Sequence, residues 1–192
     1  MSHSLNEFEA VCRKAAKGSG LFWGHAEEAG RAARILSSLG IDNGSLILVA
    51  LENFDKNCSL WIGPALCDTG LGLDSEFSLE NVSAPGLLIA FLNMLVVDKE
   101  ICIEIEWTGF KAQISAEGIF CDQFEAATVD VADIVAIRRV KSVSGVPLPF
   151  YTRAEIPNNT FQKLLELADR TYAPSTEASR LAGAGAGLND ND

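Results

Sequence analysis

The sequence predicts an α+β fold, with helices at both ends of the chain around a central antiparallel β-meander sheet. Apolar residues recur at helical spacing near the start, from Leu5 to Ala15, and again from Phe161 to Ala168. Between them, apolar and polar residues alternate strictly over 101–107 and 110–115, the period of a half-buried strand. Because helices and strands fall in separate blocks, we expect α+β rather than alternating α/β.

The length of 192 residues predicts a single domain over 1–192 that buries a core without disulfides or metal. Within it we expect an N-terminal helical part at 4–54, the sheet at 58–141, and a C-terminal helix and glycine-rich tail at 157–192. The 48% of hydrophobic and 21% of charged residues exclude wholesale disorder.

Charge and cysteine content restrict the partners and the compartment. The net charge of −11 argues against electrostatic binding to nucleic acid or to an anionic membrane. The five cysteines include no Cys-x-x-Cys pair, so neither a disulfide framework nor a zinc site is indicated. Residues 1–10 do not have the pattern of a signal peptide, and the apolar stretch at 86–97 is too short to span a bilayer. We therefore expect a reduced, cytoplasmic protein.

Two helices open the chain. Ser4 and Glu7 form a capping box for the first helix, which ends at Gly18 and Gly20. The second helix runs from about residue 24 to 39. It carries a stripe of small residues that allows close packing on a neighbour: Ala26, Gly30, Ala33 and Ser37. The apolar run at 44–53 fits either a third helix or a buried strand.

The central hairpin has a predictable register. The two-residue turn Thr108-Gly109 connects its strands. Counting across the turn gives four rungs, in which polar faces polar and apolar faces apolar: Glu106 with Lys111, Ile105 with Ala112, Glu104 with Gln113, and Ile103 with Ile114. A second tight turn, at Glu117-Gly118, continues the meander. We expect further strands at 75–82, 87–97 and 126–140.

Prolines at 147, 149 and 157 mark a loop before the last helix. Asn159 or Thr160 is the expected cap of that helix, and Pro174 ends it. One helix face carries its apolar residues: Phe161, Leu164, Leu165 and Ala168.

The first candidate site is the segment Trp23-Gly24-His25-Ala26-Glu27-Glu28, followed by Arg31. Glu27 and Glu28 lie four and three residues before Arg31, so ordinary exposed ion pairs explain the pattern. The sharper alternative places His25 and the two glutamates at a helix N-terminus, where free N–H groups bind anions and a histidine serves as acid or base. From residue types alone the ion-pair interpretation is favoured.

The second candidate site is the C-terminal tail, with Arg180 followed by Gly183, Gly185 and Gly187. Alternating glycines let the backbone approach a ligand and leave N–H groups free for an anion. The tail lacks the Lys-Ser/Thr of a phosphate-binding loop and the strand that precedes a dinucleotide site. A frayed terminus is the alternative, and composition favours it.

A third set comprises Cys58, Cys67 and Asp68, which we place around a strand end. A nucleophilic cysteine needs a nearby cation or histidine to lower its pKa. No such partner is identifiable along the chain, so a structural role is the better interpretation of both cysteines.

The end segments also carry a resemblance. The elements Gly-x-Gly-Leu, Trp-Gly and Ala-Glu-Glu-Ala-Gly-Arg-Ala-Ala-Arg within 5–36 resemble a bacterial family catalogued as a domain of unknown function (DUF3726), as does the ending Ser-Arg-Leu-Ala-Gly-Ala-Gly-Ala-Gly-Leu-Asn-Asp-Asn-Asp. Cys12 and His25 depart from the commoner family residues. The resemblance implies no mechanism, but it favours a tail packed in the molecule or in a subunit interface.

Two functions of different classes follow. The first is an enzyme of carboxylate or amino-acid-type metabolism, an isomerase or lyase acting by proton transfer. In it Arg31 or Arg180 clamps a small anionic substrate, Glu27 or Glu28 accepts the proton, and Trp23 and the glycine backbone complete the site. The second is a non-catalytic ligand-binding or assembly subunit that forms a homodimer or assists an enzyme. No motif identifies a cofactor, and no metal is indicated.

Overall fold

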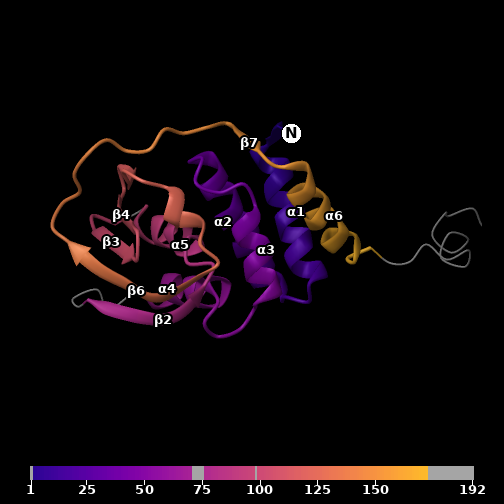
Figure 1. The fold of residues 1–192 in the computed structure, drawn as a ribbon, viewed down its shortest axis with the longest axis horizontal. Helices are drawn as coiled ribbons and strands as arrows, with labels where there is room; N and C mark the ends of the chain where they lie inside the picture. Colours follow the sequence, from indigo (N-terminus) through magenta and orange to yellow (C-terminus); the bar gives the residue numbers. More distant parts are fainter. Residues whose placement is uncertain (1, 71–75, 98, 173–192) are drawn as a thin grey trace, which may run out of the picture.

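The computed structural model describes residues 2–70, 76–97 and 99–172 (Figure 1). Their elements follow in this order: β1 (Ser2–Ser4), α1 (Leu5–Gly18), α2 (Trp23–Ser38), α3 (Ser45–Glu52), α4 (Ser59–Thr69), β2 (Phe77–Ser83), α5 (Leu87–Val96), β3 (Cys102–Trp107), β4 (Phe110–Ser115), β5 (Gly118–Phe120), the 3₁₀ turn η1 (Glu125–Thr128), β6 (Val131–Val140), β7 (Arg153–Glu155) and α6 (Asn158–Asp169). This combination confirms the α+β class.

A five-stranded antiparallel sheet forms one side of the molecule, and helices form the other. The strand order is β2-β6-β3-β4-β5. Helix α5 packs on β3 and β4 and also contacts α2 and α4, so it lies between the sheet and the helical side (Figure 1). On the far side of α2, α1 packs between α2 and α6. The core therefore runs continuously from the sheet through α5 into the helices.

The predicted hairpin register is confirmed at every rung. Glu106 faces Lys111, Ile105 faces Ala112, Glu104 faces Gln113, and Ile103 faces Ile114. β6 pairs with the other edge of β3, and β5 continues the meander beyond β4.

The expected strand at 87–97 is wrong, because this segment forms helix α5. Eight of its residues are buried, including Leu87, Phe91 and Val96. A helix covered by the sheet on one side and by helices on the other has no polar face to display the helical period. Its sequence therefore reads as a continuous apolar run, which an internal strand also produces.

The expected sheet range 58–141 contains a second helix, α4, with Pro64 inside it. The strand end that we expected around Cys58 is thus a helix start, with Cys58 as its N-cap. The apolar run at 44–53, open between helix and strand, forms α3. The strand expected over 126–140 begins only at Val131, after the 3₁₀ turn.

The N-terminal helices follow the predicted caps and packing. The Ser4 hydroxyl accepts a hydrogen bond from the Glu7 backbone N–H at 3.1 Å, which is one half of the predicted capping box, whereas the Glu7 carboxylate lies 3.2 Å from His3 Nδ1. Gly30, in the stripe of small residues on α2, lies against α1. A Cβ on Gly30 would lie 2.9 Å from the Glu9 carbonyl oxygen, which shows how closely the two backbones approach.

The segment 141–152 crosses from the sheet back to the helices (Figure 1). Its Leu148 N–H donates to the Ile119 carbonyl, and its Tyr151 N–H donates to the Ser38 carbonyl. β7 then pairs with β1, which places α6 beside the start of the chain. No helix among the described residues has the length and apolar character needed to cross a membrane.

Candidate functional site

The structure places the predicted N-terminal residues on the first turns of α2, beside α4. His25 stacks on Trp61 of α4, with ring centroids 5.4 Å apart and ring planes inclined by 10°. Phe54 also contacts His25 in a T-shaped arrangement, with ring centroids 5.7 Å apart. Neighbouring Trp23 is 56% exposed, with the Lys17 ammonium 5.4 Å from its ring centroid. His25 is therefore part of an aromatic cluster that joins α2 to α4.

Glu28 and Arg31 line a groove between α2 and α4. The Arg31 guanidinium donates to the Glu28 carboxylate at 3.1 Å, so Arg31 takes Glu28 as its partner. The groove encloses a cavity of about 250 Å³. Its remaining lining comes from α4, from α5 and from the residues after α5: Pro64, Cys67, Asp68, Met94, Leu95 and Lys99.

The groove thus combines opposite charges over an apolar floor. Arg31 and Lys99 supply two cations, and Glu28 and Asp68 supply two carboxylates. Among the described residues, only Glu28 and Arg31 of these four form an ion pair with each other. The cavity is therefore charge-balanced, with charged groups left to meet a ligand.

The pKa of the Cys67 thiol reflects its burial and the charges that line this cavity. Burial, together with the carboxylates of Glu28 and Asp68, raises the pKa of its thiol to about 11, and Lys99 offsets only part of this rise. The thiol donates a hydrogen bond to the Phe91 carbonyl at 3.3 Å. At neutral pH Cys67 is a thiol and not a thiolate nucleophile, in agreement with its expected structural role.

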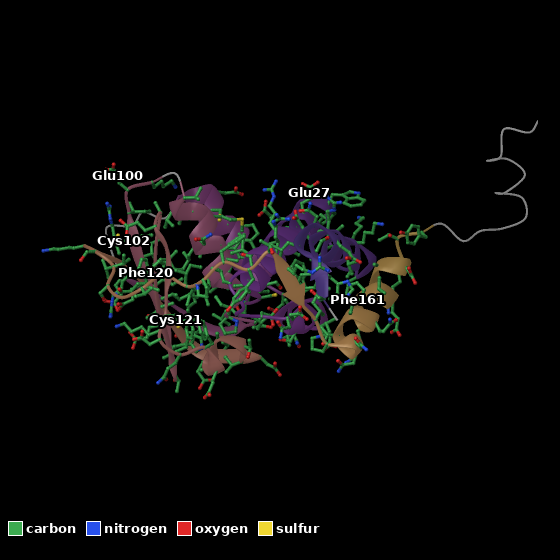
Figure 2. The ribbon with its side chains drawn as sticks, turned by 90° about the horizontal axis from the view of Figure 1, so that it is seen from above. Glu27, Glu100, Cys102, Phe120, Cys121 and Phe161 are labelled. Carbon is green, nitrogen blue, oxygen red and sulfur yellow. The ribbon has the colours of Figure 1, made fainter. Side chains whose placement is uncertain are left out.

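The other predicted residues do not join the groove within the described part of the chain. Glu27 is exposed on α2, as Figure 2 shows, and does not line the cavity. Arg180, Gly183, Gly185 and Gly187 lie outside the described residues, so the proposed closure of the site by the tail stays a prediction.

A larger cavity, of about 490 Å³, lies on the open face of the sheet. Its floor consists of neighbouring side chains of β3, β4 and β5, namely Glu106, Lys111, Gln113 and Phe120. Residues 121–123 and 144–146 form its walls. Figure 2 places Phe120 and Cys121 at the sheet, away from Glu27 on α2, so the two cavities are separate.

A buried carboxylate organises the polar groups beside this cavity. The side chain of Glu104 is 5% exposed. One oxygen accepts hydrogen bonds from Lys111 at 2.9 Å and from Arg138, and the other accepts from Gln113 at 2.8 Å. Burial opposes the ionisation of Glu104, but these hydrogen bonds outweigh it and lower its pKa. The Gln113 carbonyl oxygen accepts in turn from the Ser144 N–H at 3.0 Å.

Sequence reasoning missed this network, although part of its signal was present. The register placed Glu104 opposite Gln113 and Glu106 opposite Lys111. The basic cluster around Arg138 is also visible in the sequence. What the sequence did not show is that β6 pairs with β3 and sets Arg138 directly opposite Glu104.

Comparison with known proteins gives one finding. A family model described as "Protein of unknown function (DUF3726)" matches residues 3–66. The N-terminal third of this chain matches the DUF3726 family. This confirms the resemblance based on the N-terminal motifs, and it includes Glu28, Arg31 and Pro64 of the groove. The glycine-rich ending lies outside the match to DUF3726. No curated protein and no solved structure matches the chain.

Metal binding has no geometric support among residues 2–70, 76–97 and 99–172, where no group of three or more His, Cys, Asp or Glu is arranged to hold an ion.

Proposed function

We propose that this protein binds a small carboxylate-bearing ligand of the amino-acid type in the groove between α2 and α4. The observation that carries the proposal is the charge-balanced cavity of about 250 Å³, whose lining includes Arg31 and Lys99 as well as Glu28 and Asp68. A zwitterion complements such a site, because each of its charges meets the opposite sign.

Each lining group has a role in this proposal. The planar guanidinium of Arg31 matches a carboxylate through two parallel hydrogen bonds, and Lys99 adds a second positive charge. Asp68 accepts from the ligand's ammonium group. Met94 and Leu95 provide apolar contact for a side chain. The volume is below the usual range for drug-sized ligands, about 300–1,000 Å³, and therefore suits a small metabolite.

In this proposal the ligand carboxylate competes with Glu28 for the Arg31 guanidinium. In the free protein the Arg31 side chain is 57% exposed and pairs with Glu28, whose side chain is 27% exposed. A ligand carboxylate that recruits Arg31 removes this cation from Glu28 and makes Glu28 a better proton acceptor. This coupling supports the enzymatic form of the proposal, in which Glu28 removes a proton from the carbon beside the bound carboxylate.

Calorimetric titration with a panel of L- and D-amino acids and the matching 2-oxo acids tests the binding. We expect Arg31→Gln to weaken binding by tenfold or more, since a hydrogen bond to a charged group contributes about 1.5–3 kcal/mol. Arg34→Gln is the matched control, because Arg34 lies on the same helix and pairs with Glu9 outside the cavity. Equal affinity of the Arg31 and Arg34 variants, or no binding across the panel, would refute the proposal.

Exchange of the ligand's α-hydrogen with deuterated water tests the proton transfer. We expect exchange in the wild type, its loss in Glu28→Gln, and its persistence in Glu27→Gln, because Glu27 does not line the cavity. If all three proteins bind the ligand and none catalyses exchange, the enzymatic form of the proposal is refuted and a non-catalytic binding protein remains.

A second candidate function is assembly of a homodimer, favoured by exposed aromatic side chains around the start of α2. Phe22 is 79% exposed, Trp23 56% and Trp61 48%. Aromatic residues of this kind dominate protein interfaces. Sedimentation velocity tests this function. We expect a dimer that Trp23→Ala disrupts, and a monomeric wild type at micromolar concentration would rule it out.

A further inference from the structure

A row of four side chains along helix α2 reaches the surface. Residues four apart lie on the same side of a helix, and Trp23, Glu27, Arg31 and Ile35 form such a row. Trp23 is 56% exposed, Glu27 is exposed, and the Arg31 side chain is 57% exposed. Ile35, at the end of the row, is partly buried. Figure 2 shows Glu27 at the surface of the helical side, so the middle of the row is open to solvent.

The two charged members of this row have bonding capacity left. Glu27 has no ion-pair partner within the described residues, although Arg31 follows it at the spacing of a helical ion pair. In the described part of the chain, Arg31 donates only through Nη1, to Glu28. The N–H groups of its Nε and Nη2 therefore remain for a further acceptor.

A second copy of α2, running antiparallel to the first, complements this row. About a twofold axis between positions 27 and 31, Glu27 of each copy faces Arg31 of the other, so the same ion pair forms twice. The same register sets Trp23 of each copy opposite Ile35 of the other. A parallel pair would instead set glutamate against glutamate and arginine against arginine, which repel. The charge pattern is thus self-complementary in the antiparallel direction only.

Exposed aromatic side chains extend the row at both ends. Phe22, which is 79% exposed, adjoins Trp23 at the start of α2. At the other end, the Tyr151 N–H donates to the Ser38 carbonyl, and Tyr151 is 51% exposed. In an antiparallel pair the start of one α2 lies beside the end of the other, which brings both aromatic groups to the interface. Aromatic residues are enriched in protein interfaces, whereas complementary charges fix the register.

We propose that two copies of this chain associate through antiparallel α2 helices, with Glu27 of each copy paired to Arg31 of the other. The inference rests on the homodimer, the second candidate function, and specifies its interface. Because Arg31 also lines the groove between α2 and α4, Glu27 of the partner subunit reaches the rim of that groove. The partner thus supplies a carboxylate to each groove, and the dimer contact and the ligand share the Arg31 guanidinium.

Sedimentation velocity of charge-reversal variants tests this arrangement. Glu27→Arg sets two arginines face to face at each contact, and Arg31→Glu sets two glutamates face to face. We expect each variant alone to raise the dimer dissociation constant at least about tenfold, because repulsion replaces both ion pairs. An equimolar mixture of the two variants should recover the dimer, since the arginines of one chain then face the glutamates of the other. Glu166→Arg makes the same change of charge at an exposed position of α6, and this matched control should dimerise as the wild type does.

The outcomes separate this interface from the homodimer as such. A wild type that is monomeric at micromolar concentration refutes both. A wild-type dimer that neither variant weakens, or a mixture that stays monomeric, refutes the α2 interface and leaves a homodimer that uses another surface.

The wild type provides a measurement that does not depend on how the variants fold. Its dimer dissociation constant should rise with NaCl concentration, because salt screens exposed ion pairs, and a constant that does not change with salt would refute the pairing. None of these measurements uses a small ligand. Failure here therefore leaves the ligand proposal for the groove standing, and failure of ligand binding leaves the interface standing.

Discussion

The buried carboxylate of Glu104 provides the sharpest test of how the sheet is held together. Glu104→Gln keeps the side-chain volume and one acceptor oxygen but removes the charge. The new amide N–H₂ then faces donors, since Lys111 and Arg138 approach one carboxylate oxygen and Gln113 approaches the other. One of these contacts must therefore be lost.

The expected cost follows from the contacts. Losing a hydrogen bond to a charged group costs about 1.5–3 kcal/mol, and breaking a fully buried ion pair costs about 3–5 kcal/mol. Lys111 and Arg138 are 50% and 36% exposed, so both cations can regain water when the charge is removed. We therefore expect the cost of a lost charged hydrogen bond rather than that of a fully buried ion pair, which is a loss of about 2 kcal/mol in the free energy of unfolding at pH 7.

Urea denaturation of the wild type, Glu104→Gln and Glu106→Gln measures this loss. Glu106 is the matched control on the same strand, 46% exposed and at 3.6 Å from both cations, and its substitution should change stability by less than about 0.5 kcal/mol. Equal effects of the two substitutions would refute the assignment of Glu104 as the centre of the network.

The pH dependence gives an independent check. The pKa of Glu104 is lower in the folded protein than in the unfolded chain, so its charge stabilises the fold above the unfolded pKa, near 4.3. This contribution is lost as the pH falls through the lower folded pKa, where the carboxylate becomes protonated. The stability difference between wild type and Glu104→Gln should therefore be constant from pH 7 to 5 and shrink below about pH 4. A difference that grows on acidification would contradict the sign.

Two further predictions concern the packing and chemistry of the groove. Gly63→Ala places a Cβ 2.0 Å from the Phe91 ring. After the gain in helix propensity is subtracted, we expect this variant to lose about 1–2 kcal/mol in the free energy of unfolding, measured by urea denaturation. Gly24→Ala is the control, because a Cβ at Gly24 meets open space and should cause no loss; equal stability of the two variants would contradict the close α4–α5 contact. At pH 8, Cys67 should react with iodoacetamide about a hundredfold more slowly in the folded protein than in urea, because its thiol pKa of about 11 exceeds the ordinary 9.0 by two. Peptide mass spectrometry follows the reaction, and equal rates would show that the thiol is not half-buried beside Glu28 and Asp68.

Part of the candidate site could be predicted from the sequence. The spacing of Glu28 and Arg31 on a helix implied their ion pair, and the resemblance pointed to the same segment. Asp68 and Lys99 could not be predicted beside them, because their approach depends on how α4 and α5 pack against α2. The stacking of His25 on Trp61 likewise joins elements that no local pattern relates.

The sequence by itself determined the features that depend on neighbours along the chain. The cap at Ser4 and the rungs of the β3–β4 hairpin follow from patterns a few residues long, closed by a tight turn. The tertiary structure decided the rest. Leu87–Val96 forms a helix between the sheet and the other helices, and this burial removes the polar face that would have distinguished it from an internal strand. Glu104 became the centre of a charge network because β6, distant in sequence, brings Arg138 to it, and only long-range packing sets that distance.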